Sequence, residues 1–344
     1  MVKDQKSFLK EFVHDTSFLS PSASSDFFKR KNRSRAYDSP DNIRASALSW
    51  NNTGTLLACA GIENRGISIG SLDEKSCRVK QTSIAFESAD EGIEAVEFSK
   101  HDEFLLASSS NGKTVRTFDV RSPKSNSQTY SSKDTNLFLS WTHCGNFIVL
   151  GDKSDTISLL DRRINKVVES VSFKVEINEF ICHPNGEYIF ITTDHGKLEI
   201  FSLPKLKRVK SIQAHPPLSS CQSIAMSPNE NYIVVGGSDA CCSIWDLRDL
   251  ICVQTLTRLD YPIRTVSFSH CGNLIASGSE DRLIDIAWAS TGEKVAEVPI
   301  QAECFDVAWH PRLYLLAYAT GLGVDTLRDR DRDNVSVRIF GYSG

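Results

Sequence analysis

A short strand-forming phrase recurs seven times along this 344-residue chain, and this recurrence constrains the fold more than any other feature. In each copy an apolar residue is followed, two positions later, by a second one, at intervals of 41 to 48 residues. A unit of this size cannot bury its apolar faces alone, so such repeats stack into one body. The seven pairs are Leu48/Trp50, Val96/Phe98, Leu139/Trp141, Phe180/Cys182, Ile224/Met226, Val266/Phe268 and Val307/Trp309.

The best-preserved copy spans residues 214–246. Two short apolar segments, 221–226 and 232–235, flank a turn at 227–230, and a second turn leads to a third segment that ends in Trp245-Asp246. Turn residues between β-rich runs indicate antiparallel hairpins. Strand-rich units with a period near 40 to 45 residues and a Trp-Asp ending are typical of WD-repeat β-propellers. We therefore predict an all-β, seven-bladed WD-repeat propeller with a short N-terminal extension.

The seventh copy offers three strands, whereas propeller blades normally have four. An open outer edge would leave backbone groups unpaired. We expect residues within 33–41 to supply the missing strand, so that the propeller spans residues 33–344 and its last blade is closed by an N-terminal strand. We expect residues 1–32 to form a flexible basic arm. Apolar residues at helical spacing within 7–13 are compatible with a short amphipathic helix there.

Charge is distributed unevenly. The net charge is −4, but residues 1–44 hold nine Lys/Arg and six Asp/Glu, which leaves the repeat body at −7. The chain therefore lacks the overall positive charge of a typical nucleic-acid binder. The arm has two open interpretations, a solvated tail or a segment for nuclear import or phosphate contact. The basic residues concerned are Lys29, Arg30, Lys31, Arg33 and Arg35.

The sequence contains no phosphate-binding glycine loop and no nucleophile elbow. The tetrapeptide His-Cys-Gly-Asn at His143 and at His270 resembles a metal-ligand pair, but His183 and His310 occupy the same turn of other repeats. Turns spread around a ring do not converge on one ion. We predict no catalytic residues, no enzyme activity, no metal, no cofactor and no small-molecule substrate.

Three further features that the sequence lacks indicate the compartment in which we expect the protein, the cytosol or nucleus. No apolar run reaches the roughly 20 residues that a membrane helix needs, so no membrane contact is predicted. The first residues lack a hydrophobic signal core. The ten cysteines include no Cys-x-x-Cys pair and fall mostly at apolar strand positions, as expected for reduced thiols in the cytosol or nucleus.

A polar network is expected inside the best-preserved repeat. In WD repeats a His before the first strand, a hydroxyl on the second, an Asp in the next turn and the Trp of the third strand hydrogen-bond together. His215, Asp239 and Trp245 match this pattern, but Val235 occupies the hydroxyl position. We expect a shortened network that retains the contact between Asp239 and His215, with Asp281 in the equivalent turn of the sixth copy. These residues are assigned a structural role.

Several segments resemble the THO complex subunit 3 family of WD-repeat proteins, most closely over residues 173–344. This resemblance implies a non-enzymatic scaffold subunit of the nuclear THO/TREX assembly, which couples transcription to messenger RNA packaging and export. It implies other THO/TREX subunits as protein partners, with RNA engaged indirectly. The segments are FKVEINE at 173–179, PKLK at 204–207, SIQAHP at 211–216, RLDYPIRT at 258–265, SEDRLIDIA at 279–287, VAWHP at 307–311 and LLAYA at 315–319.

A rigid ring presents loops on two faces, and loops on rigid scaffolds commonly carry binding. We expect partner binding at one mouth of the ring, where the first strands begin. Two other functions remain open: direct RNA binding through the basic arm, and a scaffold role in another nuclear chromatin or RNA-processing complex. The mouth residues are Ser46, Glu94, Asn178, Gln222 and Arg264.

Overall fold

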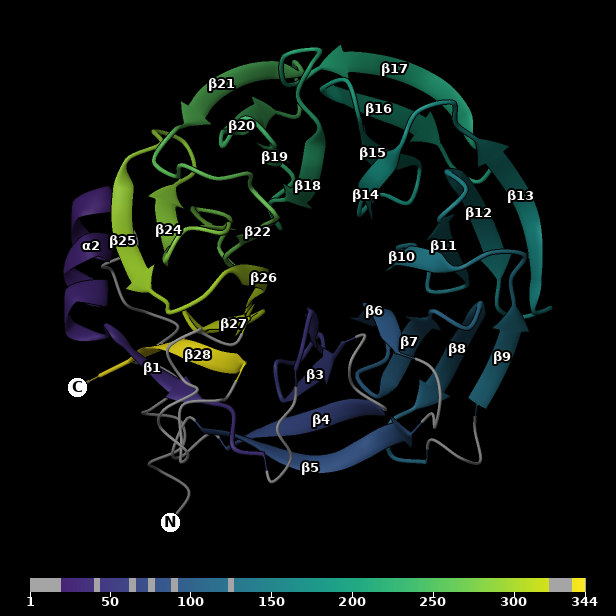
Figure 1. The fold of residues 1–344 in the computed structure, drawn as a ribbon, viewed down its shortest axis with the longest axis horizontal. Helices are drawn as coiled ribbons and strands as arrows, with labels where there is room; N and C mark the ends of the chain where they lie inside the picture. The colour runs from purple at the N-terminus through teal and green to yellow at the C-terminus, as the bar shows by residue number, and fades with distance from the viewer. Residues whose placement is uncertain are drawn as a thin grey trace.

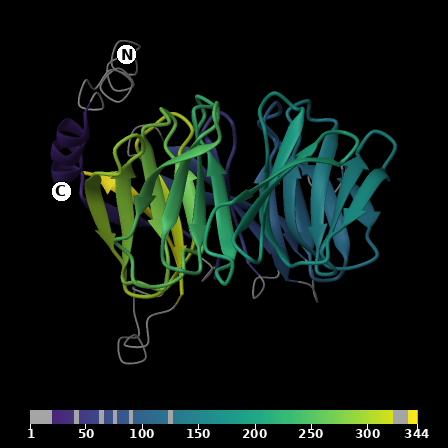
Figure 2. The ribbon, with the colours of Figure 1, turned by 90° about the horizontal axis from the view of Figure 1, so that it is seen from above.

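The computed structural model describes residues 20–39, 44–61, 66–73, 78–87, 92–122, 127–321 and 336–343. These residues form seven four-stranded antiparallel sheets around a common centre (Figure 1). Seen from the side, the sheets stand next to one another with their strands running between the two faces of the ring (Figure 2). The predicted all-β, seven-bladed propeller is confirmed.

The strands follow the chain in blade order, from the centre outwards. Blade 1 contains β2 (Ala47–Trp50), β3 (Leu56–Ala60), β4 (Gly66–Asp73) and β5 (Arg78–Glu87). Blade 2 contains β6 (Ile93–Phe98), β7 (Leu105–Ser110), β8 (Thr114–Asp119) and β9 (Ser127–Ser131). Blade 3 contains β10 (Asn136–Trp141), β11 (Phe147–Asp152), β12 (Thr156–Asp161) and β13 (Lys166–Ser172). Blade 4 contains β14 (Ile177–Cys182), β15 (Tyr188–Thr193), β16 (Lys197–Ser202) and β17 (Lys207–Gln213).

The same order continues to the end of the chain. Blade 5 contains β18 (Cys221–Met226), β19 (Tyr232–Gly237), β20 (Cys242–Asp246) and β21 (Ile251–Leu256). Blade 6 contains β22 (Thr265–Phe268), β23 (Leu274–Gly278), β24 (Leu283–Trp288) and β25 (Lys294–Pro299). Blade 7 contains β26 (Cys304–Trp309), β27 (Leu316–Thr320), β28 (Val337–Tyr342) and β1 (Arg33–Ala36).

Burial depends on the position of a strand within its blade. The second strands β7, β23 and β27 are buried along their whole length, because each sheet packs between two neighbouring sheets. The outer strands β13 and β17 are exposed at most positions. The core is therefore a ring of inter-blade contacts, and the outer strands form a solvated rim.

The N-terminal segment completes the last blade. Strand β1 pairs antiparallel with β28, with Arg35 opposite Ile339 and Ala36 opposite Arg338. β1 lies within the range 33–41 in which the sequence places the closing strand. The pairing covers the outer edge of β28, which would otherwise expose unpaired backbone groups.

Residues 20–32 differ from the expected flexible arm, because they include the helix α2 (Pro21–Arg30). Ser20 caps the helix by accepting a hydrogen bond from the Ala23 N–H at 3.3 Å, and Pro21 occupies a first-turn position where its missing N–H costs nothing. Phe27 and Phe28 are 2% and 1% exposed. Burial of these two rings stabilises the helix against the propeller. The helix expected within residues 7–13 lies outside the described residues.

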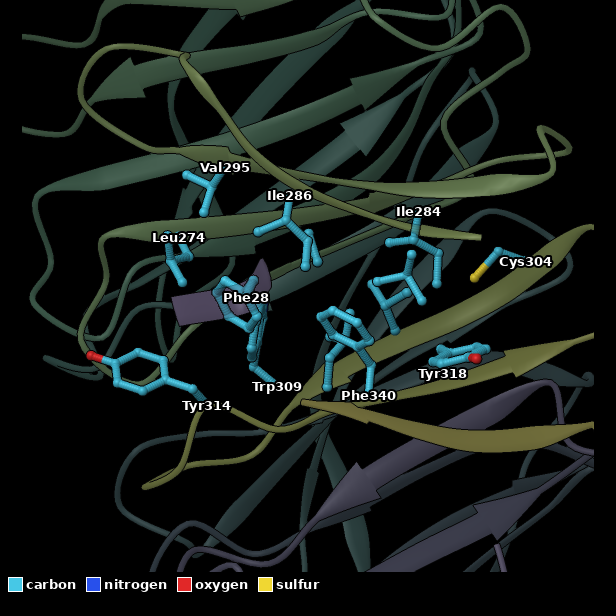
Figure 3. Packing of buried hydrophobic residues seen from close by; sticks show 14 of the residues in the cluster. Phe28, Leu274, Ile284, Ile286, Val295, Cys304, Trp309, Tyr314, Tyr318 and Phe340 are labelled. Carbon is cyan, nitrogen blue, oxygen red and sulfur yellow. The ribbon is translucent and has the colours of Figure 1, made fainter. Parts of the chain in front are cut away.

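α2 packs against β25 at the boundary between blades 6 and 7 (Figure 1). The Phe28 ring stacks on Phe340 with centroids 5.6 Å apart, and the Phe27 ring meets Tyr314 edge-on at 5.9 Å. Figure 3 shows Phe28 among the apolar side chains of both blades. The helix therefore joins these two blades.

After β1 the chain crosses to blade 1. Tyr37 is buried, and its hydroxyl lies 2.8 Å from the Ser68 hydroxyl. The ring fills the space beside Gly70, where an added Cβ would lie 2.4 Å from the tyrosine ring. The Asp38 N–H then donates to the Val79 carbonyl at 3.0 Å. We call residues 20–39 the clasp, because they contact blades 6, 7 and 1.

Candidate functional site

The inner strands are linked by side chains that accept hydrogen bonds from the backbone of the next blade. Among the described residues, three carboxylates make such links, across the boundaries between blades 2 and 3, blades 4 and 5, and blades 7 and 1. Each bond satisfies a backbone donor of the neighbouring inner strand, so these carboxylates hold adjacent blades together. The bonds run from Trp141 N to Glu97 at 2.8 Å, from Ile224 N to Glu179 at 2.6 Å, and from Leu48 N to Asp306 at 2.7 Å.

Burial raises the pKa of all three carboxyls, to about 8 for Glu179 and to about 6 for Asp306. The negative charge of Asp306 further raises the pKa of Glu179. Perturbed carboxyls often mark catalytic sites. Here the same kind of contact recurs at three blade boundaries, which indicates a structural role for each group.

The five residues expected at the mouth lie at or next to the starts of inner strands. Ser46 and Arg264 immediately precede β2 and β22, whereas Glu94, Asn178 and Gln222 are the second residues of β6, β14 and β18. Arg264 is exposed, and the other four are half-buried. Within the described ranges, no hydrogen bond or ion pair joins any two of them. They are distributed around one end of the ring.

Two mouth residues already have partners within the protein. The Arg264 guanidinium forms an ion pair with Glu280, and both side chains remain about 40% exposed, at 43% and 37%. The Asn178 side-chain amide donates to the Ser220 hydroxyl at 2.9 Å, which links blade 4 to the loop before blade 5. Burial raises the pKa of the Glu94 carboxyl, while the positive charge of Lys153 partly opposes this shift. Arg264 is thus the most accessible of the five.

The polar network of blade 5 is longer than expected. His215 Nδ1 lies 3.0 and 2.9 Å from the two Asp239 carboxylate oxygens, and its Nε2 lies 3.1 Å from the Ser243 hydroxyl. The Trp245 indole N–H donates to the same hydroxyl at 2.9 Å. The expectation of a shortened network is therefore wrong. The hydroxyl comes from the third strand, where Ser243 and Trp245 are two positions apart and share a face, so Val235 does not interrupt the network.

Asp281 makes a related network in blade 6 without a histidine. Its carboxylate accepts hydrogen bonds from the backbone N–H groups of Asp260 at 3.0 Å and Tyr261 at 3.2 Å. The Ser279 hydroxyl donates to the same carboxylate at 2.7 Å. Two backbone N–H groups thus bond the Asp281 carboxylate, whereas His215 bonds the Asp239 carboxylate in blade 5.

The five basic residues between positions 29 and 35, which we call the basic cluster, include two that contact aromatic rings and three that are exposed. The Lys31 ammonium lies 4.8 Å from the centre of the Phe27 ring, and the Arg35 guanidinium lies 4.3 Å from that of Tyr342. The first contact lies within the clasp, and the second attaches Arg35 to β28 of blade 7. The exposed members are Lys29, which bonds Asp26 at 2.9 Å, together with Arg30 and Arg33.

The histidine-containing turns lie on separate blades. His143 packs against His101 of the preceding blade, and His270 packs against Tyr314 of the following blade. Over the described part of the chain, no group of three His, Cys, Asp or Glu side chains is arranged to hold a metal ion. Within the same residues, no helix has both the length and the apolar character to cross a membrane.

The fold and these networks define a WD-repeat β-propeller with polar contacts both within and between its blades. Residues 206–246 and 250–286 match the family model described as WD domain, G-beta repeat.

The chain is 32% identical to THO complex subunit 3 of Arabidopsis thaliana over 299 residues, which cover 87% of this chain and 92% of that protein. The chain therefore belongs to the THO complex subunit 3 family. It is also 27% identical to WD repeat-containing protein AAC3 of Dictyostelium discoideum, over 87% of this chain and 65% of that one. It is 25% identical to the human serine-threonine kinase receptor-associated protein, over 55% of this chain and 53% of that protein.

Proposed function

We propose that this chain is a non-enzymatic scaffold subunit of a nuclear THO complex. Through contacts with other THO/TREX subunits it helps to couple transcription to messenger RNA packaging and export. One observation carries the proposal. The similarity to THO complex subunit 3 extends over 87% of this chain and 92% of that protein, so it covers much more than one repeat.

The geometry supports a scaffold role. The conspicuous polar groups are occupied by contacts within the propeller: His215 bonds Asp239 inside blade 5, and the carboxylates of Glu179 and Asp306 join neighbouring blades. A rigid ring held in this way can present several separate surfaces to different proteins. One of these is the mouth, where Arg264 is the most accessible of the expected contact residues.

Purification of the tagged full-length chain from nuclei of its own organism tests this function. We expect the other THO subunits to co-elute with it in constant ratios through gel filtration, and a fluorescent fusion to be nuclear. Co-elution with the subunits of a different chromatin or RNA-processing complex would instead support a scaffold role in that complex. A chain that elutes alone, or that is excluded from the nucleus, would overturn the proposal.

The second candidate function is direct RNA binding by the basic cluster, since Lys29, Arg30 and Arg33 are exposed beside one another in sequence. Each single-strand phosphate contact should cost about 0.7 log units of affinity per log unit of salt. Replacement of the three residues by alanine should flatten this slope for a labelled single-stranded RNA, whereas Lys174→Ala, at an exposed loop position between β13 and β14, should not. Absence of measurable RNA affinity at low salt would eliminate this candidate.

A further inference from the structure

The outer strands of blades 3 to 6 share one irregularity. In each blade a β-bulge interrupts the pairing between the third and fourth strands, and the residue left without a partner in the register is a valine. In blade 4, for example, Ile200 pairs with Lys210 and Phe201 with Arg208, so Val209 occupies the bulge. Because the register is the same, equivalent side chains leave their sheets in equivalent directions. The four bulge valines are Val168, Val209, Val253 and Val295.

Their exposure differs sharply. Val295 of blade 6 is 4% exposed, whereas Val168, Val209 and Val253 are 44%, 56% and 41% exposed. Seven large apolar side chains are exposed within the described residues, and five of these lie on or beside the outer strands of blades 3 to 5. The five are Ile164, Val168, Val209, Ile251 and Val253.

The clasp explains the burial of Val295. Helix α2 packs against β25, and Phe27 and Phe28 share one apolar cluster with Val295 (Figure 3). The protein thus contains its own example of how a bulge valine is covered: a short amphipathic helix lies along the outer strand and contributes aromatic side chains. Blades 3, 4 and 5 have the same valine, but no helix among the described residues covers it.

Blade 4 differs from blades 3 and 5 in charge. Residues 203–213 contain Lys205, Lys207, Arg208 and Lys210 and no acidic residue. Arg208 pairs with Glu199 at 2.7 Å. The three lysines are exposed, and no ion pair to them is found among the described residues. In contrast, the equivalent residues 162–172 of blade 3 contain Glu169 beside Arg162, Arg163 and Lys166, and residues 247–257 of blade 5 contain one basic and one acidic residue, Arg248 and Asp249.

We propose that the outer strand of blade 4, centred on Val209 and flanked by Lys205, Lys207 and Lys210, is the docking site for an acidic amphipathic helix of a partner protein. An apolar side chain of that helix covers Val209, as α2 covers Val295, and its carboxylates meet the three lysines. A few desolvated anchor side chains supply most interface energy, while charges at the edge set orientation and association rate. This proposal rests on the proposed function, because the partner is taken to be another THO subunit.

The test compares variants of the full chain for binding to an assembly of the remaining THO subunits, with fluorescence anisotropy as the readout. The triple variant Lys207→Glu, Val209→Asp, Lys210→Glu should bind at least tenfold more weakly. The variant Val209→Ser, which keeps the charges, should also weaken binding.

The matched control is Lys166→Glu with Val168→Asp, at the same strand positions of blade 3, and should change affinity less than twofold. These exposed substitutions should leave the melting temperature unchanged.

The outcomes separate the two proposals. If the unsubstituted chain does not bind the assembly, the proposed function fails and this docking site fails with it. If the unsubstituted chain and the triple variant bind equally, the docking site is wrong and the function stands. If the triple variant loses affinity only for single-stranded RNA, the strand is a phosphate-binding surface and the helix proposal is overturned. A photo-crosslinking residue at position 209 should capture an acidic helical segment, and capture of any other kind of segment contradicts it.

Discussion

Ser243 supplies the hydroxyl of the blade 5 network from the third strand, whereas the repeat pattern places that hydroxyl on the second strand. The His215 and Asp239 contact follows from residue types and their spacing in the repeat. Ser243 does not, because the repeat pattern places the hydroxyl on the second strand, where Val235 stands. A search for any Ser or Thr two positions before the Trp, on the same strand face, would have found it.

Removal of the Ser243 hydroxyl tests the network. Ser243→Ala leaves the Trp245 indole N–H without its acceptor in a buried site, so the free energy of unfolding should fall by about 1–3 kcal/mol. Urea unfolding followed by tryptophan fluorescence measures this. Ser170→Ala on the exposed part of β13 is the control and should have little effect. An equal, small change in both variants would show that the hydroxyl contributes no net stability.

Glu179 predicts a pH dependence of stability. Its pKa rises from 4.5 when exposed to about 8 in the fold, so between these values the folded chain binds more protons than the unfolded one. The free energy of unfolding should therefore decrease as pH rises from about 4.5 to 8. Glu179→Gln retains an acceptor for the Ile224 N–H but does not titrate. It should flatten this slope and be more stable than the unsubstituted chain at pH 8.

Thermal unfolding at several pH values measures the slope, and Glu169→Gln on the exposed outer strand of blade 3 serves as the control. The Asp306 carboxyl, whose pKa is raised to about 6, contributes a dependence of the same sign at lower pH. Identical slopes for Glu179→Gln and the unsubstituted chain would contradict this assignment.

Arg264→Glu tests the mouth. Reversal of this charge should weaken binding to the remaining THO subunits about tenfold or more if the mouth is a contact surface, since Arg is a frequent interface anchor. The double variant Arg264→Glu, Glu280→Arg restores an ion pair inside the protein. It separates loss of the contact from local repulsion between the two carboxylates. Unchanged affinity in both variants would remove the mouth from consideration.

At the scale of elements, the seven repeated strand groups could be predicted because period, turn residues and apolar pairs all indicate the same structure. Helix α2 could not. Its apolar content is essentially the pair Phe27-Phe28 within a Ser-rich and basic stretch, and it is stable through tertiary packing on β25 rather than through its own propensity.

Phe28→Ala tests this dependence on packing. The ring is 1% exposed and stacks on Phe340, so its removal should lower the free energy of unfolding by about 3–5 kcal/mol. Chemical denaturation measures the change. Asp26→Ala, on the exposed side of the same helix, should cost little. If Phe28→Ala were as mild as Asp26→Ala, α2 would be only loosely attached.

At the scale of the whole molecule, closure of the ring depends on the clasp. A chain that begins at residue 44 loses β1, the Phe27 and Phe28 rings, and Tyr37 from the space beside Gly70. Its melting temperature should fall on the order of 10 °C. Addition of a peptide with the sequence of residues 20–39 should restore part of the loss in a concentration-dependent way. An unchanged melting temperature would show that blade 7 closes without the clasp.

The clasp also constrains the order in which the parts of the protein can fold during synthesis. β1 leaves the ribosome about 300 residues before its partner β28, which corresponds to a delay of roughly 15–60 s at 5–20 residues per second. During this interval blades 1 to 6 can form in turn, while Phe27 and Phe28 have no completed groove to enter. Because blade 7 joins the most distant parts of the chain, its closure is expected to be the slow final step of folding. The Phe27 and Phe28 rings therefore have no complete binding surface until blade 7 has formed.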